Sequence, residues 1–422
     1  MSNFLNACLV AILSAAMFVL GCDGDKSEAG ECKGNVDCGL GACVLGECVV
    51  EPAECQTLGT FVDGSVHPFS AVDYLEEVHV LVDDEGAAHY CYSGYKDNVL
   101  ETRYGKQTSF DEFEEINLKV PGEEQVKCGA IALSSEGVPY VLSRSLPAFV
   151  YYENGQWYRR QLDSLQEREG KGAVASSQTV IHLSPDTDGG MFVSMSLGFD
   201  LGSQPIYIAH ILNGTVEELV NGWVEEGTGT VLGYAPQVIG DSVEDARYLA
   251  ADDNSYNMQW MNLDGTGAVI KEGFYPKLAQ GTQGYKAVAY VDRNWFLKVD
   301  SLSTGFTDVA TVDQIDLSID LDGQIPWDVA QDVRGRTHLI YENTNQGYGR
   351  LSYRRVNATG VVSDVLMVSD ALVQGLPGMQ RYALNTDVCG RPTVALIEYE
   401  SEVNDITGES TDYPVLKIRE GY

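Results

Sequence analysis

Basic residues are scarce in this chain. Its 422 residues include 27 Lys and Arg against 62 Asp and Glu, which gives a formal net charge of −35 at neutral pH. A surface of this sign repels phosphate backbones, so the composition argues against nucleic acid as a partner. We interpret the acidity as that of a solvated, soluble surface, with cation binding and a saline habitat as the alternative explanations.

Catalytic signatures are missing as well. The patterns GxSxG, HExxH, the P-loop and CxxC do not occur in the sequence. Residues 227–233 have one residue too many for GxGxxG and precede no helical pattern, so we interpret them as a glycine-rich turn. With 62 acids, many loops could supply a carboxylate pair for glycoside hydrolysis, and no particular pair stands out. The sequence therefore predicts no catalytic residue, no metal ligand and no cofactor.

Long helical periodicity is also lacking, whereas glycine and tyrosine are abundant. The chain holds 44 Gly and 23 Tyr, and its hydrophobic content of 44% excludes wholesale disorder. Many turns and aromatic residues without a helical period favour an all-β protein. A chain of this length can bury a large core, either as a few domains or as one repetitive domain.

One unit recurs about every 50 residues over most of the chain. It is clearest in residues 332–355, where a turn with Asp332 and Gly335 precedes an apolar strand, a polar loop and a returning strand. A period of this length with only β signals predicts a propeller of four-stranded blades. Seven turn residues precede such strands: Gly86, Gly137, Gly190, Asp245, Gly284, Gly335 and Gly390. The spacing from Asp245 to Gly284 is the shortest, so six or eight blades stay open beside seven.

The ends of the repeat array predict how the ring closes. Residues 78–82 and 129–133 are expected to be innermost strands, because small and apolar residues suit a crowded centre. The last repeat lacks an outer strand, and we expect residues 57–67 to complete the seventh blade. This would bring Cys55 beside Cys389 as a disulfide candidate. Cys91 and Cys128, in neighbouring blades, form the second candidate pair.

The N-terminal segment is apolar and ends at a cysteine. Residues 4–21 are mostly apolar, and Cys22 with a polar run follows at once. The block VLGC of residues 19–22 resembles a bacterial lipobox, although no Lys or Arg precedes the apolar run. The resemblance implies a signal peptide of residues 1–21, lipidation of Cys22 and a membrane anchor, followed by a polar tether of residues 22–31. The alternative is an uncleaved transmembrane anchor, because the run is just long enough to span.

Residues 32–56 are rich in cysteine. The closely spaced cysteines are Cys32, Cys38, Cys43, Cys48 and Cys55. This spacing predicts a small disulfide-stapled module in an exported protein. It resembles the short Dickkopf-like or EGF-like segments that follow the lipid anchor in some bacterial surface proteins. A zinc site is the alternative, but the module has no CxxC pair and no nearby His.

One turn has a family resemblance. Residues 184–190, SPDTDGG, are similar to the Asp-box turn of sialidase-like propellers, S-x-D-x-G-x-T-W. The Gly comes one place late, and Met191 and Phe192 stand where Thr and Trp are expected. The similarity supports the fold class. This segment and residues 320–323 share a D-x-D-G character, so calcium binding stays open as an alternative to a polar turn.

Two histidines occupy equivalent positions in the repeat. His89 and His338 each stand three residues after a turn Gly, where Tyr140 and Tyr248 stand in two other repeats. Equivalent positions lie in different blades, so we predict a structural role for both. His182 and His210 have no predicted role.

Three arginines follow turn residues by one or two places: Arg247, Arg336 and Arg391. They could ring one face of the propeller and bind carboxylate-bearing ligands such as acidic sugars. The alternative is that each pairs with a neighbouring acid.

These features predict a propeller of residues 57–422 on a cysteine-rich stalk, held by lipid on a bacterial cell envelope. We expect the outer membrane or the cell surface, although Asp23 favours the inner membrane under enterobacterial sorting rules. The predicted function is binding or scaffolding, with a protein or a glycan as ligand. The alternatives are a sialidase-like glycoside hydrolase or polysaccharide lyase with its site at the channel mouth, and a purely structural envelope component.

Overall fold

The computed structural model describes residues 42–44, 47–49, 61–68, 74–83, 85–109, 112–120, 125–144, 148–162, 181–196, 204–221, 232–252, 257–280, 286–302, 307–315, 327–342, 350–369, 381–387, 390–403 and 410–421. The chain divides into two compact units, Met1–Glu51 and Pro52–Tyr422. In the first unit, a hairpin of β1 (Ala42–Val44) and β2 (Glu47–Val49) places the backbone of Cys43 opposite that of Cys48. Within the described residues, no helix is long and apolar enough to cross a membrane.

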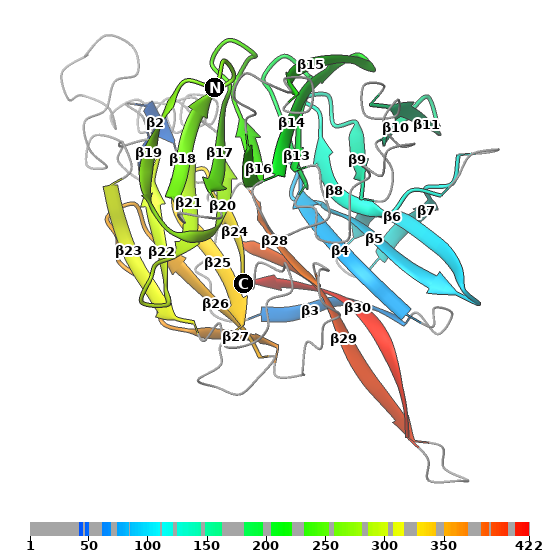
Figure 1. The fold of residues 1–422 in the computed structure, drawn as a ribbon. Coiled ribbons are helices and arrows are strands. Elements are labelled where there is room, and N and C mark those ends of the chain that lie inside the picture. Colours follow the sequence, from blue (N-terminus) through cyan, green and yellow to red (C-terminus); the bar gives the residue numbers. More distant parts are fainter. Residues whose placement is uncertain are drawn as a thin grey trace, which may run out of the picture. The chain divides into compact units, whose positions relative to one another are not determined.

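The second unit is a β-propeller of seven four-stranded antiparallel blades (Figure 1). Blade 1 consists of β4 (Tyr74–Val82), β5 (Ala88–Lys96), β6 (Val99–Ser109) and β7 (Glu112–Asn117). Blade 2 consists of β8 (Cys128–Leu133), β9 (Pro139–Ser143), β10 (Ala148–Glu153) and β11 (Gln156–Gln161). Blade 3 consists of β12 (Ile181–Pro185), β13 (Met191–Ser196), β14 (Gln204–Leu212) and β15 (Thr215–Asn221). The predicted fold class and the favoured blade number are thus confirmed.

The remaining blades follow the same order. Blade 4 consists of β16 (Leu232–Ile239), β17 (Arg247–Asp252), β18 (Asn257–Asn262) and β19 (Gly267–Glu272). Blade 5 consists of β20 (Phe274–Gln280), β21 (Lys286–Val291), β22 (Phe296–Ser301) and β23 (Thr307–Gln314). Blade 6 consists of β24 (Trp327–Gln331), β25 (Thr337–Glu342), β26 (Leu351–Val356) and β27 (Leu366–Ser369). Blade 7 consists of β28 (Tyr382–Thr386), β29 (Pro392–Val403), β30 (Ser410–Gly421) and β3 (Phe61–Pro68).

The short repeat spacing near Asp245 comes from compact connections and not from a missing blade. Three of the four strands of blade 4, β17, β18 and β19, have six residues each, and Gly273 alone separates β19 from β20 of the next blade. A short pairing of β14 with β16, Gln204 opposite Gly233, also joins blades 3 and 4 into one continuous sheet.

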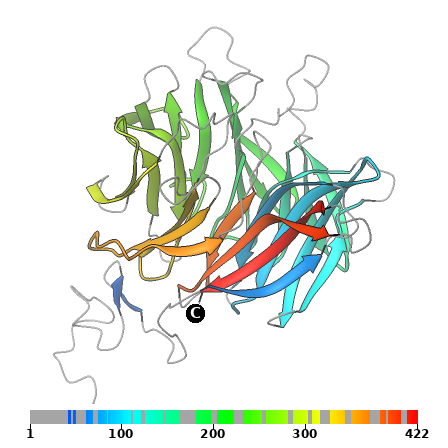
Figure 2. The same ribbon diagram turned by 90° about the horizontal axis from the view of Figure 1, so that it is seen from below.

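The last blade is built from both ends of the propeller sequence. β3 pairs antiparallel with β30, from Phe61 opposite Gly421 to Pro68 opposite Val415 (Figure 2). This pairing supplies the outer strand that the last repeat lacks in the sequence. It covers an edge of β30 that would otherwise expose unpaired backbone groups.

The first strand of each blade is innermost, and these strands form a ring. β4 packs beside β8, and the contacts continue through β12, β16, β20, β24 and β28, which packs beside β4. Each inner strand has one edge that no strand of its own blade covers, so its backbone groups need other partners. Side chains of the neighbouring blade supply several of them. The N–H of Leu278 donates to Gln237 Oε1 at 2.7 Å, and the N–H of Leu384 donates to Asp328 Oδ2 at 2.8 Å.

Apolar side chains fill the space between blades. β9 is buried along its whole length, because both of its faces lie against neighbouring sheets. Between blades 2 and 3, the cluster includes Leu142 and Phe149 from one sheet and Val193 and Tyr207 from the other. This agrees with the predicted apolar character of both faces of the strand that follows each turn.

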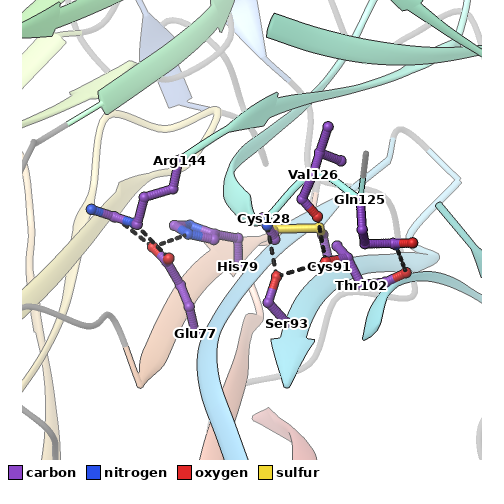
Figure 3. The surroundings of a disulfide bond; sticks show 9 residues. All are labelled: Glu77, His79, Cys91, Ser93, Thr102, Gln125, Val126, Cys128 and Arg144. Atoms are coloured by element: carbon purple, nitrogen blue, oxygen red, sulfur yellow. Dashed lines mark hydrogen bonds and ion pairs between the residues drawn. A yellow bond between two sulfur atoms is a disulfide. The ribbon is translucent and has the colours of Figure 1, made fainter. Parts of the chain in front are cut away.

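Blades 1 and 2 are also joined covalently and by an ion pair (Figure 3). The predicted Cys91–Cys128 disulfide is present, between β5 and β8. Arg144 donates from Nε and Nη2 to the two carboxylate oxygens of Glu77, each at 2.5 Å. Burial alone would raise the pKa of Glu77, but Arg144 and His79 hold it below its usual value. Five other cysteines with predicted roles lie outside the described residues: Cys22, Cys32, Cys38, Cys55 and Cys389. For Cys43 and Cys48 only the backbone is described.

Candidate functional site

A cavity of about 890 Å³ lies at the end of the ring where the inner strands turn into the second strands. Each of the seven blades contributes to its wall, mostly through the last residues of the inner strand and the turn that follows. One lining residue from each blade, in chain order, is Asp83, Ser134, Asp186, Asp241, Ala279, Asp332 and Asp387. The pseudo-symmetric ring thus gathers seven segments that are far apart in the sequence around one space.

Three of the acids in this wall, Asp83, Asp186 and Asp332, are held by their own turns. Asp332 Oδ1 accepts the N–H groups of Arg334 and Arg336, both at 2.9 Å. Asp83 Oδ1 accepts two N–H groups in the same way, two and four residues on, at 3.0 and 2.8 Å. Asp186 also repeats the arrangement, at 2.9 and 2.6 Å. A carboxylate that accepts several backbone N–H groups stabilises its turn. Fewer of its lone pairs then remain available for a substrate or for proton transfer.

His338 connects such a turn to the third strand of its blade. Its Nε2 donates to Asp332 Oδ2 at 3.0 Å, and its Nδ1 lies 2.8 Å from the Tyr353 hydroxyl. A carboxylate accepts only, so the hydroxyl donates to Nδ1 of a neutral imidazole. Burial lowers the pKa of His338, against the opposing effect of Asp332. Burial would raise the pKa of Asp332, but His338 and Arg336 outweigh it and lower the pKa to about 2.

The same arrangement recurs in blade 1. His89 Nε2 lies 3.0 Å from Asp83 Oδ2, and its Nδ1 lies 2.5 Å from the Tyr104 hydroxyl. The hydrogen bonds of His89 and His338 agree with the structural role predicted for both residues. In blade 3, His210 reaches the turn from the third strand instead, with Nε2 2.6 Å from Asp186 Oδ2. No sequence pattern indicates His210, because it lies 24 residues from Asp186 along the chain and meets it only when the blade forms.

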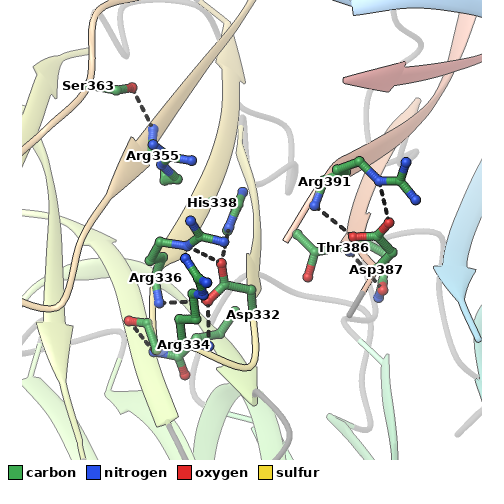
Figure 4. Close-up of polar contacts among 12 residues, drawn as sticks. Asp332, Arg334, Arg336, His338, Arg355, Ser363, Thr386, Asp387 and Arg391 are labelled. Atoms are coloured by element: carbon green, nitrogen blue, oxygen red, sulfur yellow. Dashed lines mark hydrogen bonds and ion pairs between the residues drawn. The ribbon is translucent and has the colours of Figure 1, made fainter. Parts of the chain in front are cut away.

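The three predicted arginines do not assemble into a ligand site. Arg336 Nε lies 2.5 Å from Asp332 Oδ2, and Arg391 Nε lies 2.6 Å from Asp387 Oδ2 (Figure 4). Arg247 Nη1 donates to the carbonyl of Ala246 at 2.9 Å. Arg336 and Arg391 thus each pair with a neighbouring acid, as the alternative interpretation predicts.

The D-x-D-G segments do not form a described cation site. In the described residues, no group of three or more His, Cys, Asp and Glu side chains could hold a metal ion. Asp186 uses both carboxylate oxygens within its blade, on Gly190 and on His210. Residues 320–323 lie outside the described part of the chain.

Two polar side chains of the wall keep an unused hydrogen-bonding atom. His182 Nδ1 on β12 and Gln331 Oε1 on β24 are buried without a hydrogen-bond partner among the described residues. Burial and the charge of Lys277 lower the pKa of His182 to about 4, so its imidazole is neutral at pH 7. Neither residue belongs to a sequence motif. They line the same cavity because closure of the ring brings blades 3 and 6 around it.

Comparisons with known proteins concern the fold. No protein-family model matches the chain, and no curated protein matches it. Virginiamycin B lyase from Staphylococcus aureus is 10% identical, with a TM-score of 0.47, over 85% of this chain and 98% of that one. Sqt1 from Saccharomyces cerevisiae is 13% identical, with a TM-score of 0.46, over 84% and 88% of the two chains. The fucose-specific lectin from Aleuria aurantia is 11% identical, with a TM-score of 0.41, over 82% and 97%.

Proposed function

We propose that this protein is an exported binding protein that holds a polar ligand, a glycan or a segment of a partner protein, at the end of its central channel. The observation that carries the proposal is the cavity of about 890 Å³ walled by all seven blades. Its volume falls within the range of roughly 300–1,000 Å³ that is typical of ligand sites. A rigid ring keeps such a wall in place before the ligand arrives, which lowers the entropic cost of binding.

The side chains of the wall favour binding over catalysis. The carboxylates of Asp83, Asp186 and Asp332 and the imidazole of His89 already have partners within their own blades. His182 Nδ1 and Gln331 Oε1, in contrast, have hydrogen-bonding capacity that a ligand can use. A buried polar atom without a partner costs free energy, so a ligand that satisfies both atoms gains affinity and selectivity.

The same proposal includes a lipid anchor at Cys22 on a bacterial envelope. The support is the VLGC block of residues 19–22 and the Cys91–Cys128 disulfide. Disulfides persist in oxidising compartments outside the cytosol, which fits an exported chain.

The test is a thermal-shift screen of the mature protein with Cys22 replaced by Ser, against a glycan panel with and without calcium. A ligand at a hundred times its Kd should add roughly 2.7 kcal/mol to the free energy of unfolding. Gln331→Leu should reduce the shift of a ligand bound in the cavity, and the matched change Gln314→Leu, on the outer strand of blade 5, should leave it intact. A shift with new reducing ends or unsaturated products would replace the proposal with an enzyme. No shift in the whole panel would leave a protein ligand as the occupant.

A further inference from the structure

One form of four-residue turn recurs throughout the propeller. In it, the N–H of the fourth residue donates to the carbonyl of the first at 2.8–3.0 Å. The fourth residue is a glycine with φ between 67° and 87° in six turns, which end at Gly86, Gly137, Gly265, Gly335, Gly360 and Gly390. Glycine is the residue expected there, because it has no Cβ to clash at positive φ.

The turn between β21 and β22 has a tryptophan in the glycine position. Trp295 donates its N–H to the carbonyl of Asp292 at 3.0 Å and has φ 65°. Asp292 Oδ1 accepts the N–H groups of Asn294 and Phe296, so the turn is otherwise like the others. A bulky residue in this conformation costs about 1–3 kcal/mol, and such strain is typical of functional positions.

The strained residue presents a flat aromatic surface. The indole of Trp295 stacks on the ring of Phe274, with centroids 5.8 Å apart and an interplanar angle of 20°, and the residue is still 45% exposed. The indole therefore packs against Phe274 and keeps part of its surface exposed to solvent. Phe274 fixes the orientation of the indole, so little side-chain entropy is lost when a ligand stacks on it.

A charged residue precedes each of the two aromatic residues in the chain. Arg293 Nε lies 2.8 Å from Glu272 Oε2, and the two side chains are 59% and 48% exposed. They stand two residues before Trp295 and Phe274, respectively. Glu272 ends β19 of blade 4, so the ion pair lies where blade 4 leads into blade 5. A flat apolar face beside a hydrogen-bond donor and acceptor matches a sugar ring, which has one face of C–H groups and hydroxyls around its edge.

We propose that Trp295 is the stacking platform of a second binding site, which takes a neutral hexopyranose unit of a glycan, with Arg293 and Glu272 bonding its hydroxyls. The site is separate from the cavity. Phe274 pairs with Val291 at one end of blade 5, whereas Leu278 and Ala279 line the cavity toward the other end of β20. The inference therefore does not depend on what the cavity binds.

The experiment measures binding of methyl glycosides of glucose, galactose, mannose, fucose and N-acetylglucosamine, and of their di- to tetrasaccharides, by saturation-transfer NMR and calorimetry. We expect Trp295→Gly to weaken binding at least tenfold and Trp295→Phe to weaken it less. Gln331→Leu, in the cavity, should not change it, so failure of this site and failure of the cavity proposal are distinguishable.

The stability of Trp295→Gly gives an independent readout. Glycine adopts the positive φ of this turn without strain, so the denaturation midpoint should stay unchanged or rise. This is the result expected if Trp295 is kept for binding at a cost in stability. Sugar binding that persists in Trp295→Gly would overturn the proposal, as would the absence of binding by any sugar tested. A lower midpoint with unchanged affinity would show that the indole serves only to pack on Phe274.

Discussion

His338 and Asp332, six residues apart, meet at 3.0 Å in a contact that blade 1 repeats between His89 and Asp83 with the same spacing and distance. In both blades a tyrosine hydroxyl of the third strand bonds the other imidazole nitrogen. The contact therefore joins a turn to two strands of its blade. In blade 6 both side chains are fully buried, whereas Asp83 in blade 1 is 13% exposed.

The difference in burial predicts unequal costs of mutation. Asp332→Asn should lower the free energy of unfolding by about 3–5 kcal/mol, because it leaves Arg336 and His338 in a buried site without their anion. Asp83→Asn should cost clearly less, since water reaches its site. Urea denaturation of both variants measures the difference. Equal losses would show that burial does not control the strength of this contact.

Acid should destabilise the propeller from below pH 6.5. The folded-state pKa of His182 is lowered from 6.5 to about 4, and those of His338 and His89 are also lowered, so the unfolded chain binds protons first. Stability is therefore complete above pH 6.5 and falls as the pH drops toward 4. For His182 a shift of this size is worth about 3 kcal/mol. His182→Gln should flatten the dependence of the melting temperature on pH between 6.5 and 4, whereas an unchanged slope would contradict the assignment.

The Cys91–Cys128 disulfide closes a loop with a sequence separation of 37 residues. Replacing both cysteines by Ala should lower the free energy of unfolding by about 4 kcal/mol on the chain-entropy relation. Denaturation of the double variant, with and without dithiothreitol, measures this loss. The reductant should destabilise the parent protein more than the variant, because the other predicted disulfides are present in both.

Peptide mapping under non-reducing conditions tests the remaining cysteine predictions. A peptide that links Cys55 to Cys389 would support a second lock on the ring, and a free thiol at either position would contradict it. In the N-terminal unit, the register of Cys43 opposite Cys48 makes a bridge between these two the first pairing to look for.

The anchor prediction concerns Cys22. In a bacterial host, Cys22→Ser should move the protein from the membrane fraction to the soluble fraction, because the acyl chains can no longer be attached. Mass spectrometry of the parent protein should find a diacylated N-terminal peptide that begins at Cys22. An unprocessed N-terminus in the membrane fraction would favour the transmembrane alternative instead.

The outer strand β3 should be indispensable to the ring. Deleting residues 57–68 from the mature protein exposes the edge of β30, so we expect lower stability and concentration-dependent association on size-exclusion chromatography. Deleting residues 32–51 is the matched control, because it leaves Cys55 and the pairing of Phe61 with Gly421 intact. If both deletions behave alike, β3 is not what closes the ring.

Local signals in the sequence predicted the architecture well. Glycines such as Gly335 and Gly390 mark turns because positive φ requires them, and the strands after them are apolar on both faces because two blades enclose them. The Cys91–Cys128 pair followed from the repeat register. The register also placed His89 and His338 in equivalent positions before their partners were known.

Local signals in the sequence do not predict the residues of the two candidate sites. His182 and Gln331 meet at one cavity only after seven blades close, and nothing local distinguishes them from other strand residues. Trp295 was missed for the opposite reason, because its backbone conformation contradicts its residue type. Glycine at the fourth position identifies the other turns in the sequence, but it does not identify the turn that ends at Trp295.

The pairing in blade 7 makes closure of the ring depend on two strands that are far apart in the sequence. The strand that begins at Phe61 finds its partner only when Gly421 is available, so six blades can assemble from neighbouring hairpins while the ring stays open. A chain cut short by translation or proteolysis before β30 leaves β3 unpaired and cannot reach the closed state. Only a chain that contains both β3 and β30 can close the ring, so a copy that lacks β30 keeps an open strand edge.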